Sequence, residues 1–123
     1  MEENIKMNVE QIRNYCIEKK GVTEGFPFDE ETLVIKVMEK MFALVNLVPP
    51  FSINLKCDPE KAIELREEHE EITPGFHMNK KHWNTFSLEG RLTSTFIKEW
   101  IDHSYNCVVK GLPKKDRDRL AEL

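Results

Sequence analysis

Residues 51–57 have the sequence Phe51-Ser52-Ile53-Asn54-Leu55-Lys56-Cys57, a strict alternation of apolar and polar side chains. Successive side chains of a strand point to opposite faces, so the apolar set lies on one face and Ser52, Asn54 and Lys56 lie on the other. This alternation predicts an antiparallel sheet with one covered face. Asp58-Pro59 follows directly and predicts a helix start, with aspartate as the cap and proline in the first turn.

The same patterns, followed outward, predict the other elements. Strands are expected at 32–38, 41–47, 51–57 and 82–88, and the short separation Glu39-Lys40 suggests a tight hairpin between the first two. Helices are expected at about 9–20, from 58 to about 69, and from Thr93 or Ser94 to Gly111, with a charged tail after Pro113. We therefore predict one α+β domain spanning 1–123, in the order α-β-β-β-α-β-α, with helices packed on one face of an antiparallel sheet.

Composition excludes several classes of protein. The 123 residues are 40% hydrophobic and 33% charged, as in an ordinary globular domain. The acidic N-terminus does not resemble a signal peptide, and the longest apolar run, Met41–Val45, is too short to span a membrane. Three cysteines far apart suggest reduced thiols. We expect a cytoplasmic protein with no membrane contact.

Charge is distributed unevenly along the chain. The net charge is −4, which argues against a generic nucleic-acid binder. Residues 58–71 hold seven acidic and two basic side chains, whereas residues 110–119 hold five basic and two acidic ones. We expect a polarised surface, on which the acidic run is a solvated helix face.

The run Pro74–Asn84 combines residue types that neither a solvated loop nor a buried strand needs. It holds two lysines, two histidines, two aromatic residues and two asparagines. We predict a loop-to-strand junction, with His82 and Asn84 on the inner face of the strand and Trp83 on the outer face beside Lys56. Two interpretations stay open: Trp83 belongs to an exposed binding surface, or Trp83 is covered by the first helix or the N-terminal loop and fixes the fold.

Short motifs along nearly the whole chain carry a family resemblance. They are Gly21-Val22-Thr23 with Phe26-Pro27-Phe28, Leu33–Val37, Leu55–Pro59, Pro74–Asn84, Ser104-Tyr105 and Leu112–Lys115. In this order they resemble the MmcQ/YjbR family. The resemblance implies a fold like that of bacterial frataxin and a DNA-binding surface, and it implies no catalytic residues.

Three hypotheses follow for the function. The first is a non-enzymatic binding module that binds DNA weakly, with a Kd of about 10⁻⁴–10⁻⁶ M. Its expected contacts are Lys56, His77, Lys80, Lys81, His82, Trp83, Asn84, Lys114, Lys115 and Arg117. The alternative is a protein-interaction adaptor that uses the open sheet face or the acidic helix. The third is a small-molecule sensor with a pocket formed by Phe26, Phe28 and Trp83.

Neither a metal site nor an enzyme is expected. A zinc site needs three or four converging ligands, and the four histidines lack such partners in the sequence. They are His69, His77, His82 and His103. The three cysteines continue apolar stripes, and no histidine or other base neighbours them at a motif spacing. They are Cys16, Cys57 and Cys107. We therefore expect no catalytic residues and no cofactor.

Overall fold

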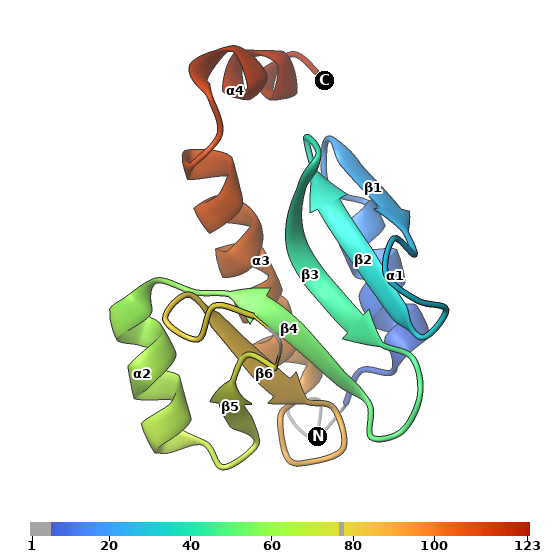
Figure 1. Cartoon of the computed structure of the whole chain (residues 1–123), viewed down its shortest axis with the longest axis vertical. Coiled ribbons are helices and arrows are strands. Elements are labelled where there is room, and N and C mark those ends of the chain that lie inside the picture. Colours follow the sequence, from blue (N-terminus) through green and yellow to red (C-terminus); the bar gives the residue numbers. More distant parts are fainter. Residues whose placement is uncertain (1–5, 77) are drawn as a thin grey trace.

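Six strands and four helices form the described part of the chain, residues 6–76 and 78–123, in a computed structural model (Figure 1). The helices are α1 (Val9–Ile17), α2 (Pro59–Glu68), α3 (Ser94–Lys110) and α4 (Lys114–Ala121). The strands are β1 (Val22–Gly25), β2 (Thr32–Val37), β3 (Lys40–Asn46), β4 (Ser52–Lys56), β5 (Ile72–Pro74) and β6 (Trp83–Ser87). None of the helices in these two ranges has the length and apolar character that crossing a bilayer requires.

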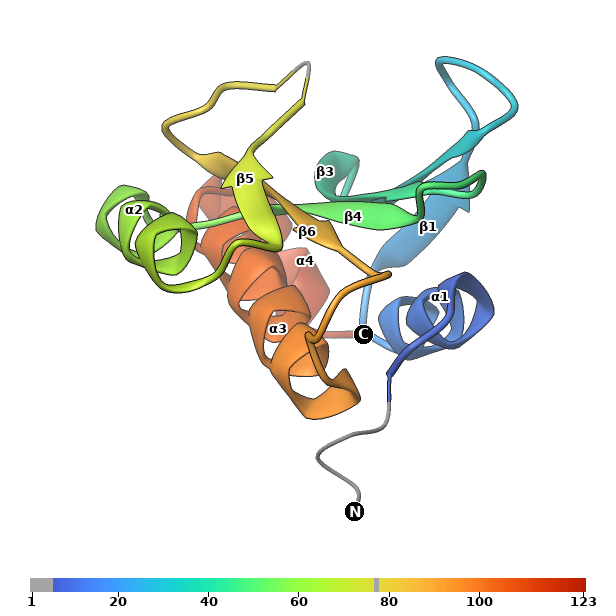
Figure 2. The same cartoon turned by 90° about the horizontal axis from the view of Figure 1, so that it is seen from below.

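The strands form one antiparallel sheet in the order β1-β2-β3-β4-β6-β5. Figure 2 shows α1 and α3 on one side of this sheet, and two loops rising from the other side: loop 26–31, and loop 75–82, of which residues 75, 76 and 78–82 are described. The core lies between the sheet and the helices, where Ile12, Phe42 and Ile101 have no exposed surface. The predicted α+β class, with helices packed on one face of an antiparallel sheet, is confirmed.

The face assignment of β4 is also confirmed. Ile53 and Leu55 are fully buried in the core, whereas Ser52, Asn54 and Lys56 are half-buried on the opposite face. This opposite face has its own small apolar cluster, which contains Val34, Leu44 and Trp83. The sheet is therefore apolar over part of its uncovered face as well.

Three elements are missing from the predicted order. β1 and β5 have four and three residues, and each pairs with a single neighbouring strand at an edge of the sheet. Such short segments cannot show a period-two pattern, and β5 ends in a proline, a residue found mainly at sheet edges. α4 is mostly charged and its buried residue is Leu120, so its sequence has no apolar stripe and was predicted as a tail.

The turn between β2 and β3 lies one residue earlier than predicted. Val37 pairs with Lys40, and the two residues between them, Met38 and Glu39, have φ angles of 48° and 73°. Two successive positive φ values are typical of a type I′ hairpin turn, which asparagine and glycine adopt most easily. The pairing of two buried strands therefore sets the turn here, against the preference of its residues.

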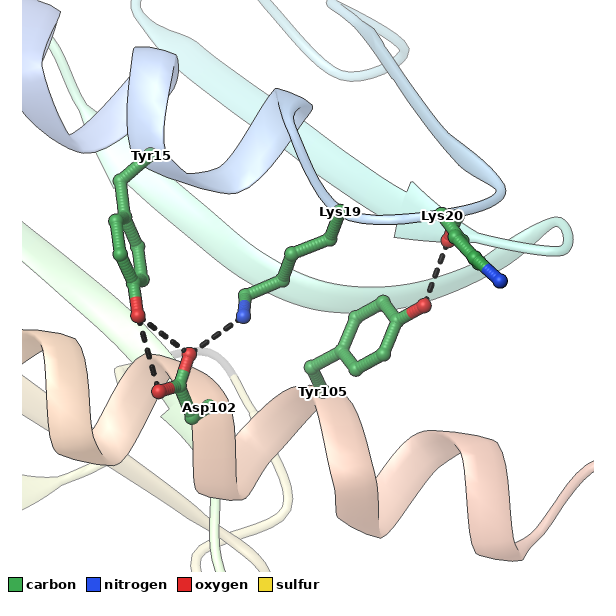
Figure 3. Close-up of polar contacts among 5 residues, drawn as sticks. All are labelled: Tyr15, Lys19, Lys20, Asp102 and Tyr105. Carbon is green, nitrogen blue, oxygen red and sulfur yellow. Dashed lines mark hydrogen bonds and ion pairs between the residues drawn. The ribbon is translucent and has the colours of Figure 1, made fainter. Parts of the chain in front are cut away.

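α1 and α3 are joined by polar contacts on the surface of the helical layer (Figure 3). The Tyr15 hydroxyl lies 2.8 and 2.9 Å from the two carboxylate oxygens of Asp102, and the Lys19 ammonium lies 2.5 Å from the same carboxylate. Lys19 Nζ also lies over the Tyr15 and Tyr105 rings, 4.9 and 5.2 Å from their centres. These contacts fix the end of α1 against the middle of α3.

α4 packs against the turn that follows α1. Gly21 has a φ of +72°, and a Cβ at this position would lie 2.6 Å from Leu120 Cδ1. A side chain would therefore displace the end of the Leu120 side chain, and the backbone conformation itself favours glycine. The predicted end of helix 1 at residue 20 is wrong by a few residues, because α1 ends at Ile17 and the chain turns before Gly21.

Candidate functional site

A groove of about 750 Å³ lies on the uncovered face of the sheet. Its floor includes Met41 and Leu44 from β3, Asn54 from β4 and Thr85 from β6. One rim is loop 26–31, which contributes Phe28, and the other is loop 75–82, which contributes Phe76 and Met78. We call this feature, defined by these residues, the sheet-face groove. Its size is within the range of cavities that bind small molecules or protein side chains.

The two rims carry large exposed apolar side chains. Phe28 is 65% exposed and Phe76 is 69% exposed. A phenylalanine that loses this much surface to a partner contributes substantially to binding, because burial of apolar area is favourable at roughly 25 cal/mol per Å². Two such residues on facing rims of one groove form a candidate binding site.

Loop 75–82 is held in place by its own hydrogen bonds. The Lys80 ammonium donates to the Gly75 carbonyl at 2.9 Å, and the Trp83 amide donates to the Asn79 carbonyl at 3.0 Å. The Phe76 amide donates to Thr85 Oγ1 at 3.1 Å, and that hydroxyl donates in turn to Asn54 Oδ1. The loop is therefore fixed to the floor of the groove, so little order has to be gained on binding.

Loop 26–31 is fixed at its end by Asp29. The carboxylate accepts hydrogen bonds from the backbone amides of Glu31 and Thr32 at 2.9 and 2.8 Å. The bond from Glu31 is the main cause of a lowered Asp29 pKa. The carboxylate is thus ionised at neutral pH, and this rim of the groove is acidic.

Trp83 and Asn84 are buried and do not form a contact surface. Trp83 is 8% exposed and packs with Val34 and Leu44 beneath Met78. Asn84 has no exposed surface: it donates to the Ala62 carbonyl at 3.1 Å and accepts from the Arg66 guanidinium at 2.7 Å. The prediction that these two side chains contact a partner directly is therefore wrong. Trp83 is covered, as one of the two interpretations expected, but among the described residues Met78 packs against it rather than a residue of the first helix.

The predicted basic contacts lie in two places. Lys80 and Lys81 are exposed on loop 75–82, His82 is half-buried at its end, and Lys56 lies opposite Trp83 in the β4–β6 register. His82 precedes β6, although it was predicted to start the strand. His77 lies outside the described residues.

The predicted basic contacts at the C-terminal end of the chain lie elsewhere. They are Lys114, Lys115 and Arg117. All are exposed on α4, beyond the far end of α3 (Figure 1). Lys114 is paired with Asp118 at 2.9 Å. The nine predicted residues that the structure describes therefore do not form one surface.

The predicted pocket of Phe26, Phe28 and Trp83 does not form either. Phe28 lines the sheet-face groove, Trp83 lies below its floor, and Phe26 lines a separate depression of about 490 Å³ against α1. Sequence reasoning missed Met41, Leu44 and Met78 as lining residues. The available signal was that two irregular segments, each with an exposed phenylalanine, flank strands that share a sheet.

One cysteine does have a histidine beside it. Cys107 Sγ lies 3.4 Å from His103 Nε2 on the preceding turn of α3, a contact that the absence of a motif spacing did not predict. The same nitrogen accepts a hydrogen bond from the Asp58 amide at 3.1 Å. Burial raises the pKa of the Cys107 thiol and lowers the pKa of His103. Both shifts oppose a thiolate–imidazolium pair, which a cysteine nucleophile requires.

The described ranges 6–76 and 78–123 contain no group of three or more histidine, cysteine or acidic side chains placed to hold a metal ion. The acidic side chains of α2, Glu60, Glu64, Glu67 and Glu68, are exposed. They form a solvated face, as predicted from the charge pattern. The chemistry of the described surface is therefore that of apolar contact, neutral hydrogen bonding and separated charges.

Fold and site together define a small α+β protein with helices on one face of a six-stranded antiparallel sheet and a groove on the other. The chain belongs to the YjbR family, whose model matches residues 17–107. This confirms the family predicted from the short motifs.

Relatives of known sequence cover nearly the same length. The YjbR protein of Escherichia coli K12 is 35% identical over 118 residues, which is 95% of this chain and all of that protein. The YyaQ protein of Bacillus subtilis is 30% identical over 112 residues, covering 79% of this chain and 94% of that one.

A solved structure shares the architecture. The crystal structure of Deinococcus radiodurans protein DR2400, from the DUF419 family, is 38% identical and superposes with a TM-score of 0.88 over 98% of this chain and 92% of that one. A Pseudomonas syringae protein is 28% identical with a TM-score of 0.72, over 82% of this chain and 98% of that one.

Proposed function

We propose that this protein is a non-enzymatic binding module whose sheet-face groove takes an apolar segment of a protein partner. The observation that carries the proposal is the pair of exposed phenylalanines, Phe28 and Phe76, on facing rims above a floor that includes Met41 and Leu44. Apolar and aromatic residues of this kind are enriched at the centres of protein interfaces. The hydrogen-bonded rims favour binding with little rearrangement.

The electrostatics of the groove favour a protein segment over a phosphate backbone. Among its lining residues the charged one is Asp29, and loop 26–31 adds Glu30 and Glu31. Phosphate groups bind through lysine and arginine, so an acidic rim would repel them. The neutral side chains of the floor, Asn54 and Thr85 among them, suit the amide groups of a peptide.

Non-enzymatic function and a cytoplasmic location are parts of the same proposal. The raised pKa of Cys107 beside a histidine of lowered pKa supports the absence of a cysteine nucleophile. Cys16 and Cys57 are buried as thiols, which supports a reducing compartment. The likeness to bacterial frataxin stays a prediction.

Weak DNA binding is the second candidate. Its support is the exposed pair Lys80 and Lys81, on the same loop as the exposed ring of Phe76. A cation beside an aromatic ring can hold a phosphate and a stacked base of a single strand. The net charge of −4 and the acidic opposite rim weaken this candidate.

The chain offers a matched set of phenylalanines for the test. Short random peptides displayed as a library are selected against the wild-type protein, and the enriched peptides are titrated against Phe28→Ser, Phe76→Ser and Phe26→Ser. Phe26 is 51% exposed on the same loop as Phe28 but lines the separate depression, so it is the control. We expect the first two variants to lose at least tenfold in affinity and the control to keep it.

Labelled single- and double-stranded DNA are titrated in parallel, at low and high salt. DNA binding would be assigned to loop 75–82 if it is salt-sensitive and is abolished by Lys80→Glu with Lys81→Glu. The control variant, Lys114→Glu with Lys115→Glu, should then bind DNA as wild type does. Failure to enrich any peptide, or enrichment of peptides that bind Phe28→Ser and Phe76→Ser as well as wild type, would remove the peptide proposal.

A further inference from the structure

The two loops that form the rims of the sheet-face groove carry opposite charges, which, apart from Asp29, lie outside the described lining of the groove. Loop 26–31 holds Asp29, Glu30 and Glu31, all exposed. Loop 75–82 holds Lys80 and Lys81, also exposed. The Lys80 ammonium donates to the Gly75 carbonyl within its own loop, so its charge stays at this rim. A ligand that crosses the groove thus meets negative charge at one end and positive charge at the other.

The sheet fixes the separation of the rims. Loop 26–31 leads into β2 and loop 75–82 leads into β6, and β3 and β4 lie between these strands. Adjacent strands are about 4.8 Å apart, so three intervals separate β2 from β6 by roughly 14 Å. The register places Thr32 level with Ser87, four residues from Trp83, so the two loop ends are also offset by roughly 13 Å along the strands and lie about 20 Å apart. An extended chain advances about 3.3 Å per residue and covers this distance in about six residues.

The floor between the rims offers apolar surface together with neutral hydrogen-bonding groups. Met41 and Leu44 contribute the apolar surface. Asn54 accepts from Thr85 through Oδ1, and none of the described residues accepts a hydrogen bond from its amide nitrogen. That nitrogen can donate to a carbonyl oxygen of a peptide. The middle of the groove therefore suits an uncharged apolar stretch with a polar backbone.

Resting on the function proposed above, we propose that the partner segment is an extended peptide with a basic and an acidic residue about six positions apart and apolar side chains between them. The basic residue meets loop 26–31, and the acidic residue meets loop 75–82. Charge complementarity of this kind sets which partner binds and in which direction, more than it adds affinity.

The fluorescence of Trp83 can report peptide binding in the groove. The chain has two tryptophans, and Trp83 lies directly below the groove floor against Leu44, partly covered by Met78. Trp100→Phe removes the other emitter, so binding in the groove is followed through Trp83 alone. All proteins in the test carry this change.

Three peptides share one apolar centre, taken from a sequence that binds the groove, and differ in their ends. One has a basic and an acidic end, one has two basic ends, and one has two acidic ends. We expect the mixed peptide to bind the unaltered rims about tenfold more tightly than the other two at low salt, as expected for a few exposed ion pairs. The difference should shrink at high salt because exposed charges are screened.

Reversing the charge of one rim should change which of the three peptides binds most tightly. Lys80→Glu with Lys81→Glu makes both rims acidic and should favour the peptide with two basic ends. Glu30→Lys with Glu31→Lys makes both rims basic and should favour the peptide with two acidic ends. Lys114→Glu with Lys115→Glu changes the net charge by the same amount as the first variant, but on α4, and should leave the order of the three peptides unchanged.

The outcomes separate this inference from the proposed function. Peptides that depend on Phe28 and Phe76 but bind equally whatever their ends would overturn the charge pattern and leave the groove as a peptide site. Loss of all peptide binding would overturn both. Sedimentation that shows concentration-dependent self-association, abolished by Phe28→Ser, would assign the groove to a second copy of the chain. DNA that competes with the peptides would assign the groove to nucleic acid. Either result overturns the inference.

Discussion

Tyr15 on α1 donates its hydroxyl hydrogen to the carboxylate of Asp102 on α3, a residue 87 positions further along the chain. The contact is half-buried, and Lys19 adds its ammonium group to the same carboxylate. Sequence patterns predicted both helices but not this link between them. Because the Tyr15–Asp102 contact joins the first helix to the longest one, its loss should measurably lower the free energy of unfolding (Figure 3).

Tyr15→Phe should lower the free energy of unfolding by about 1–2 kcal/mol, the range for a partly buried hydrogen bond to a charged group. The ring and its packing stay in place, so the change isolates the hydroxyl. Urea denaturation followed by circular dichroism measures the difference. Asn14→Ala, an exposed neighbour on the same helix, is the control and should change stability by less than about 0.5 kcal/mol. Equal losses in both variants would contradict the role of the hydroxyl.

The same tyrosine should make stability fall at alkaline pH. Burial, with the Asp102 hydrogen bond second, raises the pKa of Tyr15 from 10.0 to about 12. A raised pKa means that the folded state holds the proton more tightly, so this stabilisation is complete below pH 10 and is lost as the pH approaches 12. Wild type should therefore lose stability more steeply than Tyr15→Phe over this interval. Parallel curves for the two proteins would count against it.

His103 should make stability fall at acidic pH. Burial, followed by Lys61, lowers its pKa from 6.5, and its Nε2 accepts the Asp58 amide at 3.1 Å, which an imidazolium cannot do. A lowered pKa gives stabilisation that is present above pH 6.5 and is lost as the pH falls below it. His103→Gln keeps an acceptor without titrating, so its unfolding free energy should depend less on pH between 8 and 5. The same acid dependence in both proteins would exclude this residue as the cause.

Trp83 should matter for stability far more than the lysines beside it. Trp83→Ala removes a side chain that is 92% buried, since 8% is exposed, and should cost about 3–5 kcal/mol. Lys81→Ala, two positions away and exposed, should change stability by less than about 0.5 kcal/mol. Thermal unfolding of the two variants checks the contrast. A small effect of Trp83→Ala would mean that the packing of this ring contributes little to the stability of the fold.

The fold was predictable where a periodic pattern of apolar residues extends over a whole strand or helix. The alternation through Ile53 and Leu55 fixed the inner face of β4, and the Asn8 cap and the Gly111 stop limited α1 and α3. β1, β5 and α4 are too short or too polar for a period to appear. Their positions are set by pairing along β2 and β6 and by the contact of Leu120 with Gly21, which are long-range interactions.

The site was predictable only in part, because the sequence shows composition and not how a loop folds back. The run Pro74–Asn84 does border the groove, yet its tryptophan is buried under Met78 and its last asparagine is held by Arg66 from α2. The groove itself depends on Met41 and Leu44, which resemble ordinary strand residues. Only the sheet order brings loop 26–31 and loop 75–82 to opposite rims of one surface.

Thiol accessibility gives a last prediction. Cys16 and Cys57 are 0% and 1% exposed, and burial raises the pKa of each thiol from 9.0 to about 12. Cys107 is half-buried and its pKa is also raised, but it lies nearer the surface. A thiolate-specific reagent at pH 8 should therefore modify Cys107 slowly, leave the other two thiols intact in the folded protein, and modify all three in denaturant. Cys107→Ser should abolish the reaction of the folded protein, whereas Cys16→Ser should leave its rate unchanged. Fast reaction at Cys107, at or above the rate of a free thiol in solution, would show an activated thiolate beside His103 and would contradict the non-enzymatic proposal.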